Sequence, residues 1–484
     1  MTLDRIDIGA SRNTSRSWMG RILPIVTMTT AGFALTVLVF YPGYMTNDAA
    51  YVYQFMREWR FGDWQSPLMS MLWRLVDPIA PGPGSMFLVI ATLYWLGFAV
   101  VALTLARRSA TLGRIVPLLA LVPPAFMLVG MIWRDVLFAV VWLVAAALVY
   151  ANAKRSGNER APAAVASLSP AGRGSPAVPQ SQAVFNRVVR WSVAAVPLIL
   201  IGFGVLLRPT SFVAAPLIAA YAIWPTRFDW KRAAILFVPA LALGYALILV
   251  VYYVIIDAKR EHPLHSVFVF DLGGITHFTG ENQFPVSWSA EESRLLTTSC
   301  YNPDRWDSYW TTEPCRFVMA RLERPNDLLF GTPRLTATWA RAVTAHPLAY
   351  LRHRLTYFST FLFDPDTLTL ELYDADDPAK TPLAQNRYFK ALLAVHDTLK
   401  GSVLFRPGFW LVLAALICGM AARARATPAG AFAIGVASSA IVYLMTFLLV
   451  GVAADFRYGY WCVLASLVAG AALFSAGRER SAAL

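Results

Sequence analysis

Long apolar runs alternate with short polar segments along most of this chain. About ten of these runs approach the length that crosses the hydrocarbon core of a bilayer as a helix, at about 1.5 Å per residue. They lie at residues 22–41, 85–106, 113–132, 136–152, 191–207, 210–225, 233–256, 403–421, 427–451 and 458–476. The pattern predicts an all-α polytopic membrane protein with about ten transmembrane helices.

Two longer polar regions interrupt this pattern. Residues 257–402 form the longest stretch without a spanning run, and we expect a mixed extracytoplasmic domain there, between the seventh and eighth spans. Residues 154–184 are rich in Ala, Pro, Ser and Gly and lack apolar periodicity, which predicts a disordered cytoplasmic connector. The outer domain then separates an N-terminal transmembrane module at residues 1–256 from a C-terminal one at residues 403–484.

The composition agrees with a membrane protein, since 57% of the residues are hydrophobic and only 15% are charged. The net charge of +13 would suit a nucleic-acid partner, but the basic residues stand in short clusters between the apolar runs. This is the pattern of the positive-inside rule, so we expect membrane lipids and no nucleic acid as partners. The clusters orient the spans with both termini in the cytoplasm, and we expect a multi-pass protein of the plasma (inner) membrane.

The segment at residues 41–76 follows the first apolar run and holds the first candidate residue, Asp48. That run lacks a small-residue cleavage site, so we expect it to remain as an anchor that carries Asp48 to the outer face. Pro42 and Gly43 end the spanning helix. After Pro67, an apolar face at helical spacing predicts a short helix on the membrane surface. The carboxylate would lie between these two helices.

Three further charged residues lie in separate connections that open on the same face. Asp135 lies in the short turn between the third and fourth spans, Arg208 follows the fifth span, and Arg457 precedes the tenth. Ionisable side chains at membrane depth are costly and tend to be functional. We therefore expect these three residues and Asp48 to converge on one cavity.

Each candidate also has an ordinary structural interpretation. Asp48 would cap the helix that follows it. Asp135 would pair with Arg134 at an interfacial turn, and Arg457 would pair with Asp455 or anchor the tenth helix at the headgroups. Taken singly, none of these residues decides between structure and function.

The outer domain holds two further features. Cys300 and Cys315 lie close together in an oxidising compartment, which predicts a disulfide worth roughly 3 kcal/mol in the chain-entropy model. Residues 345–357 form an amphipathic basic pattern, which predicts a helix on a phosphate-bearing membrane surface. The sequence holds no GxGxxG, GxxxxGK[ST] or HExxH motif, so cytosolic nucleotide-driven chemistry has no support.

Several short motifs stand at corresponding places along the chain. They are YMTNDAAYVYQ around Asp48 with Trp64-Gln65-Ser66-Pro67 after it, WRDVLF around Asp135, Arg208-Pro209, and Asp455-Phe456-Arg457-Tyr458. Together with the large outer region before the last spans, these motifs resemble the GT-C class of integral-membrane glycosyltransferases. One departure is Gln65-Ser66-Pro67, where many members of that class carry a step like His-Pro-Pro.

The resemblance implies a glycosyltransferase, a hexosyl- or pentosyltransferase, that uses a polyprenyl-phosphate-linked sugar at the outer face of the cell envelope. Asp48 would take the proton of the acceptor hydroxyl and Asp135 would assist it. The two aspartates would alternatively hold a divalent cation, Mg²⁺ or Mn²⁺. Arg208 and Arg457 would bind the donor phosphate. Contacts to the acceptor or the sugar would come from three residues of the first outer loop: Tyr44, Tyr51 and Gln65.

The chemistry of such a reaction agrees with these residue types. Glycosyl transfer needs a base for the acceptor and positive charge for the leaving phosphate, and a single displacement with one base predicts inversion. The acceptor would be a glycan, a lipid or a protein. The same charges would also suit a transporter or flippase of lipid-linked or small solutes, a polysaccharide polymerase or ligase, or a non-catalytic receptor. A transporter predicts charges spread across the bilayer depth, whereas these cluster at one face.

Overall fold

A computed structural model of the chain describes residues 8–166, 195–324, 328–367 and 382–481. In these residues the fold is helical throughout, and four isolated β-bridges occur in place of strands. The all-α polytopic class is therefore as predicted. The domain expected to be mixed is helical in its described part, because its polar segments pair only at single bridges and do not continue into ladders.

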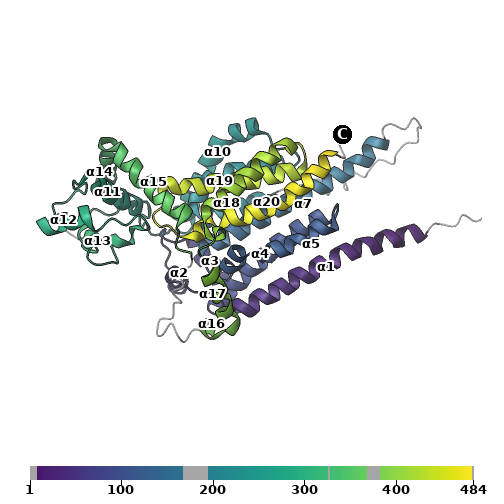
Figure 1. The fold of residues 1–484 in the computed structure, drawn as a ribbon, viewed down its shortest axis with the longest axis horizontal. Coiled ribbons are helices and arrows are strands. Elements are labelled where there is room, and N and C mark those ends of the chain that lie inside the picture. The colour runs from purple at the N-terminus through teal and green to yellow at the C-terminus, as the bar shows by residue number, and fades with distance from the viewer. Residues whose placement is uncertain (1–7, 167–194, 325–327, 368–381, 482–484) are drawn as a thin grey trace, which may run out of the picture.

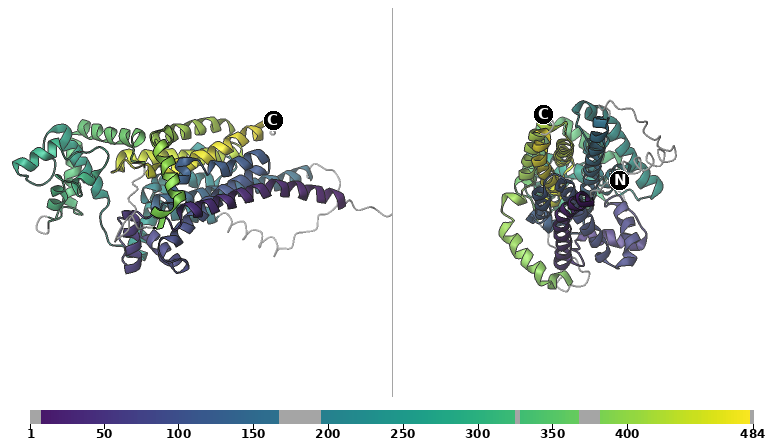
Figure 2. Two further views of the ribbon diagram at one scale, coloured as in Figure 1. Left: turned by 60° about the horizontal axis from the view of Figure 1, so that its bottom comes forward. Right: turned by 90° about the vertical axis from the view of Figure 1, so that its right-hand side faces the viewer.

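Seven helices in the described residues are long and apolar enough to cross a membrane. They are α1 (Ile8–Phe40), α4 (Pro83–Ala106), α7 (Arg134–Ala166), α10 (Trp230–Leu249) with its π-helical continuation η3 (Val250–Ile255), α18 (Pro407–Ala421), α19 (Pro428–Val450) and α20 (Tyr460–Ser481). The helices α1, α4, α7 and α20 run side by side along the long axis of the molecule (Figure 1). The start of α1 and the end of α20 lie at the same end of the bundle (Figure 2).

The other three predicted spans are shorter or interrupted. The run at residues 113–132 forms α5 (Ala110–Leu119) and α6 (Pro123–Leu128), because Pro123 and Pro124 begin a new helix. The run at residues 191–207 is described as the helix Ala195–Leu207. The run at residues 210–225 forms η2 (Pro209–Val213) and α9 (Ala215–Ile223). At about 1.5 Å per residue, α5, α6, η2 and α9 are each too short to cross the hydrocarbon core alone, and the residues before Ala195 lie outside the described part of the chain.

The helix α7 continues to Ala166, so the beginning of the connector predicted at residues 154–184 is helical. The remainder of that connector, from residue 167, lies outside the described residues.

The helices α7 and α20 form the centre of the bundle. In the most apolar stretch of each helix 83% of the residues are buried, compared with 11% for α10 with η3. A small residue allows a further helix to approach α7 closely, since a Cβ atom on Gly204, in the helix Ala195–Leu207, would collide with the indole of Trp142 on α7. The outer surface of α10 is aliphatic and exposed, which suits contact with lipid chains.

Two short helices cover the outer end of the bundle, α2 (Asn47–Glu58) and α3 (Pro67–Val76). The N-cap of α2 is Thr46, whose hydroxyl accepts a hydrogen bond from the backbone N–H of Ala49. Asp48 is therefore not the cap of this helix. It lies in the first turn, where a carboxylate also interacts favourably with the helix dipole.

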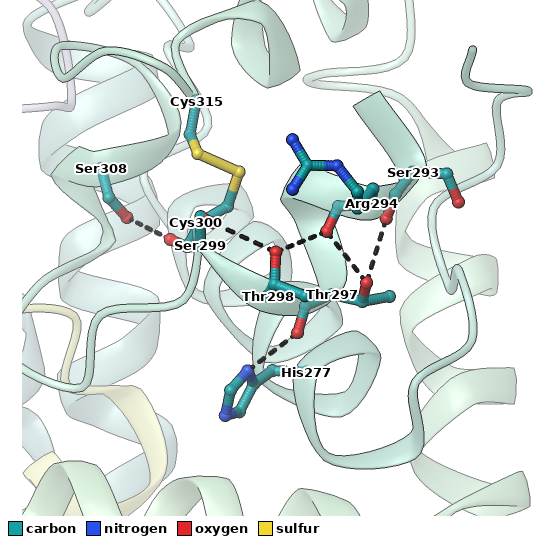
Figure 3. Close-up of a disulfide and its surroundings, with 9 residues drawn as sticks. All are labelled: His277, Ser293, Arg294, Thr297, Thr298, Ser299, Cys300, Ser308 and Cys315. Atoms are coloured by element: carbon teal, nitrogen blue, oxygen red, sulfur yellow. Dashed lines mark hydrogen bonds between the residues drawn. A yellow bond between two sulfur atoms is a disulfide. The ribbon is translucent and has the colours of Figure 1, made fainter. Parts of the chain in front are cut away.

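The outer domain projects beyond the bundle at the end opposite to the start of α1 (Figure 1). Its helices are α11 (Leu264–Thr279), α12 (Ala290–Thr298), α13 (Phe317–Leu322), α14 (Pro333–Ala345) and α15 (Pro347–Phe363), and α17 (Arg387–Leu399) returns beside α1. The predicted disulfide between Cys300 and Cys315 is present, with the Cα atoms 5.4 Å apart (Figure 3).

The basic helix predicted over residues 345–357 differs from the structure. The helix is interrupted at His346, because Pro347 begins α15 as a separate helix. His353 and Arg354 point inward to the buried carboxylate of Asp271 on α11. Arg352 remains exposed, so the surface is less basic than predicted, and its contact with a membrane stays a prediction. The exposed side of α15 carries Leu348, Leu351 and Leu355.

Candidate active site

Backbone pairing between distant segments brings the outer loops together. The N–H of Tyr44 donates to the carbonyl of Gly130 at 2.8 Å, and the N–H of Ile132 donates to the carbonyl of Tyr44 at 3.1 Å. This pairing places the start of α2, with Asp48, beside the start of α7, with Asp135.

A second set of pairings holds the loop between α19 and α20. The N–H of Trp306 donates to Val452 O at 2.8 Å, so the outer domain pairs with one side of this loop. On the other side, the N–H of Asp366 donates to Ala454 O at 2.7 Å, and the N–H of Phe456 donates to Asp366 O at 2.9 Å. The loop is therefore fixed between two segments of the outer region just before Arg457.

Arg457 lies between two carboxylates at the centre of the site. Its Nη1 atom is 2.8 Å from Oδ2 of Asp48, and its Nε atom is 3.1 Å from Oδ2 of Asp455. The guanidinium also lies over the indole of Trp133, with Cζ 4.2 Å from the ring centroid. Gln65 donates from Nε2 to the other oxygen of Asp48 at 3.0 Å. The carboxylate and the guanidinium are therefore held in a fixed mutual orientation.

Asp135 and Arg208 form a second ion pair behind this one. Oδ1 of Asp135 is 3.0 Å from Nε of Arg208, and their side chains are 5% and 8% exposed. The ring of Tyr458 lies between the two arginines, 4.9 Å from Cζ of Arg208 and 5.3 Å from Cζ of Arg457. By contrast, the side chain of Asp48 is 40% exposed. The site therefore has an accessible charge pair at the front and a buried one behind.

A small pocket opens at the front of the site. Its volume of about 10 Å³ is about the room for one water molecule. The polar and aromatic lining comprises Asp48, Gln65, Trp133, Arg134, Asp135, Arg457 and Tyr458.

The loop that carries Gln65 is anchored on both sides. Ser66 caps α3 and donates from its hydroxyl to Leu206 O at 3.0 Å, close to Arg208 in the chain. Arg134 donates from Nη1 to Trp64 O at 2.8 Å. The predicted pair between Arg134 and Asp135 is replaced by these contacts, because Arg208 takes the carboxylate of Asp135.

Two of the predicted substrate contacts lie elsewhere. Tyr44 is buried, and its ring packs against Phe389, 5.9 Å between centroids. Tyr51 donates from its hydroxyl to Oε1 of Glu261 at 3.0 Å. The structure therefore does not bring Tyr44 or Tyr51 to the pocket, because each ring is engaged by an outer segment that the sequence pattern does not connect to it.

The two aspartates do not fit a shared cation site as they are arranged. Each already holds a guanidinium, Arg457 for Asp48 and Arg208 for Asp135. Throughout the described residues no group of three or more His, Cys, Asp or Glu side chains is arranged to hold a metal ion.

Asp455 was expected only as a structural partner of Arg457, and it proves to be part of the site. Burial raises the pKa of its carboxyl to about 6, against the lowering effect of the Arg457 charge. The side chain also accepts the backbone N–H of Arg457 at 3.0 Å. Arg457 therefore pairs with Asp455, as its structural interpretation predicted, and with Asp48 as well.

A buried cluster that no sequence pattern predicted holds the site loop. Arg354 on α15 contacts Oδ1 of Asp271 through Nε at 2.6 Å and donates from Nη1 to Gly451 O at 2.7 Å. Trp339 donates to the other oxygen of Asp271 at 2.7 Å. The available signal was the single carboxylate inside the apolar sequence VFVFDLGG, since a buried charge requires a partner.

The comparisons with known proteins are sparse. No protein-family model and no curated protein matches the sequence. Among solved structures, the chain is similar to the archaeal oligosaccharyltransferase AglB from Archaeoglobus fulgidus in complex with an inhibitory peptide and a dolichol-phosphate. The two share 12% identity at a TM-score of 0.38, over 96% of this chain and 51% of that one. The apo form of the Archaeoglobus fulgidus oligosaccharyltransferase gives 12% identity and a TM-score of 0.37, over 94% and 51%. The chain thus spans about half the length of these proteins, and a likeness of this size does not assign a function.

Proposed function

We propose that this protein is a membrane glycosyltransferase that moves a sugar from a polyprenyl-phosphate-linked donor to a cell-envelope acceptor at the outer face. The observation that supports it is the half-exposed carboxylate of Asp48, held 2.8 Å from the guanidinium of Arg457 at one end of an apolar bundle. A base and a phosphate-binding cation are the two groups that this reaction needs next to each other.

In the proposed reaction Asp48 accepts the proton of the acceptor hydroxyl. The hydroxyl oxygen forms a bond to the anomeric carbon of the donor sugar while the bond from that carbon to the phosphate oxygen breaks. The electron pair leaves with the polyprenyl phosphate, and Arg457 offsets its charge. The products are the glycosylated acceptor, the polyprenyl phosphate and protonated Asp48. A single displacement of this kind inverts the anomeric configuration.

Arg457 has to change partners for this reaction. Without a bound sugar donor, Nη1 of Arg457 is directed to Asp48 and Nε is directed to Asp455. A donor phosphate that binds the outer Nη1 would release the carboxylate of Asp48 as a free acceptor for the proton. Asp455 would meanwhile keep the Nε contact, so the guanidinium stays in position. Donor binding would in this way activate the base.

The buried pair behind the site has a positioning role in this proposal. Arg208 neutralises Asp135 at 3.0 Å and so is not free for a donor phosphate. Its charge instead lies against the ring of Tyr458, next to Arg457 in the chain. Of the two arginines predicted to bind phosphate, the proposal therefore assigns that role to Arg457 and assigns Arg208, with Asp135, to holding the loop.

The proposed setting is the plasma (inner) membrane, with both termini in the cytoplasm and the site outside. A transporter would require charges along a path through the bilayer. Away from their ends, the seven spans that the structure describes carry no charged residue. Asp135 and Arg457 each lie in the first turn of a span, at the end that forms the site. This placement favours chemistry at one face.

The test is transfer by the purified protein in lipid nanodiscs, supplied with a mixture of polyprenyl-phosphate sugars and cell-envelope acceptors and followed by mass spectrometry. The wild type should transfer a sugar, and Asp48→Asn should not. Asp397→Asn is the matched control, because Asp397 is an exposed carboxylate paired with Lys400 at 3.0 Å on α17. The transporter would instead be supported by two results together: the wild type transfers no sugar from any donor, and in liposomes it carries the donor across the bilayer.

A further inference from the structure

Three tryptophans from two distant segments form a row that leads away from the pocket. Trp64 precedes Gln65, the residue that binds Asp48. The ring centroids of Trp64 and Trp306 are 5.8 Å apart, and those of Trp306 and Trp310 are 5.9 Å apart with an interplanar angle of 25°. Trp306 is buried, whereas Trp310 is 48% exposed. The row therefore ends in an indole that solvent reaches.

The segment that carries two of these indoles is rigidly held. Trp306 and Trp310 both lie in the loop that the Cys300–Cys315 disulfide closes. Within that loop the hydroxyl of Ser308 donates to Cys300 O at 2.9 Å (Figure 3). The backbone of Trp306 also pairs with Val452 in the site loop at 2.8 Å. The orientation of the row relative to the pocket is therefore fixed by covalent and hydrogen-bonded contacts.

A carboxylate borders the exposed end of the row. Asp307 accepts a hydrogen bond from Nε1 of Trp310 at 3.2 Å, and Asp304 is exposed two residues before Trp306. Burial raises the pKa of Asp307, and repulsion from Asp48 adds to this effect, so Asp307 lies within electrostatic range of the pocket. The surface thus combines a flat apolar face with an anionic hydrogen-bond acceptor at its rim.

We propose that the indole of Trp310, supported from beneath by the buried ring of Trp306, forms a binding platform for a sugar ring of a saccharide acceptor, with Trp64 continuing the row toward Gln65. The C–H face of a pyranose ring matches an indole in size and polarity, and its hydroxyls donate to the carboxylate at the edge. This inference rests on the proposed function and names its acceptor as a glycan.

Tryptophan is also common where proteins meet lipid headgroups. The charge of this surface argues against that role here. Asp307, which contacts Trp310, would be repelled by phosphate headgroups, and the neighbouring Arg305 is already paired with Asp366 at 2.9 Å. A neutral polyhydroxylated chain benefits from the carboxylate of Asp307. The row also begins at Trp64, next to the residue that contacts Asp48. A lipid anchor would not require this proximity to the reacting carboxylate.

The test is binding without any lipid donor, so that its failure is distinct from failure of the transfer reaction. Neutral hexasaccharides of glucose, mannose and galactose are titrated against the full-length protein in nanodiscs, with saturation-transfer NMR as the readout. Trp310→Ala should weaken binding by about fivefold or more, and Trp310→Tyr should recover most of the affinity, because it keeps an aromatic face. Trp310 is 48% exposed and stacks on the buried ring of Trp306, so a thermal unfolding curve of each variant checks that the loop remains folded.

Trp59→Ala is the matched control. Trp59 is 58% exposed at the end of α2, but the guanidinium of Arg74 lies 4.7 Å from its ring centroid and covers one face. Saccharide binding should be unchanged in this variant. Equal affinities for the wild type and Trp310→Ala would overturn the proposal. Failure of all three hexasaccharides to bind the wild type would also overturn it. The same holds if Trp310→Ala loses binding to anionic vesicles and keeps its binding to saccharide.

Discussion

Arg457 is the residue whose replacement tests the site geometry in most detail. A lysine at this position keeps the positive charge but has one ammonium group in place of the planar fork. It can reach Asp48 or Asp455, but not both with the geometry that Nη1 and Nε provide at 2.8 Å and 3.1 Å. Arg457→Met removes the charge and leaves two carboxylates facing each other.

The expected magnitudes follow from the hydrogen bonds that a lysine cannot replace. A hydrogen bond to a charged group contributes about 1.5–3 kcal/mol. Solvent reaches Asp48, so the hydrogen bond from Nη1 belongs at or below the lower end of that range. Arg457→Lys should therefore lower the free energy of unfolding by about 1–2 kcal/mol. If the fork also stabilises the leaving phosphate, removal of one donor costs about 3 kcal/mol in the transition state, which is a factor of about 10² in kcat.

The assay is steady-state transfer from the polyprenyl-phosphate donor, with kcat and KM measured separately. Arg457→Lys should reduce kcat by about a hundredfold and change the KM of the donor by only a few fold, because the long-range attraction to phosphate remains. Arg457→Met should raise the KM as well. A kcat of Arg457→Met within about threefold of the wild type would refute the placement of this guanidinium at the reacting centre.

Three further predictions concern the surrounding structure. Asp135→Leu or Arg208→Met alone should lower the free energy of unfolding by about 3–5 kcal/mol, and the double variant should lower it by less than either. A double-mutant cycle of thermal unfolding measures these values, and additive losses would contradict a paired role. Because burial raises the pKa of Asp455 to about 6, its contribution to stability is fully present below a pH of about 4 and is lost as pH rises through about 6. The KM of the sugar donor should also fall as pH drops through about 6, because the guanidinium of Arg457 then loses one anionic partner. Asp455→Asn should give the low KM across this range. A pH dependence of KM that persists in Asp455→Asn would contradict the assignment of this titration to Asp455. Replacing both disulfide cysteines, Cys300 and Cys315, with serine should destabilise the outer domain by roughly 3 kcal/mol, measured by hydrogen exchange, while exchange in the bundle is unchanged.

The apolar pattern was sufficient to predict the class of fold and the positions of seven long helices. Spanning helices are specified locally, by length and composition, so each long run could be identified by itself. The same pattern could not show that Pro123 divides the run at residues 113–132. A run of apolar residues has the same hydropathy whether one helix or two short ones are formed from it.

The orientation of the spans also predicted that Asp48, Asp135, Arg208 and Arg457 lie at one end of the bundle. The partners of these residues could not be predicted, because pairing depends on contacts between distant segments. Arg208 lies 73 positions after Asp135 in the sequence, and no periodicity relates the two. The bridges that join the site loop to the outer domain are single pairs of residues, too short to leave an alternating pattern.

The most direct test of the account measures donor binding and turnover on one preparation of Asp48→Asn in nanodiscs. The account predicts that this variant binds the polyprenyl-phosphate donor at least as tightly as the wild type, because Nη1 of Arg457 no longer pairs with a carboxylate. At saturating donor its kcat should fall by about 10²–10⁴, the usual contribution of a general base. Loss of donor binding together with an unchanged kcat for the bound fraction would show that Asp48 positions the donor and is not the base.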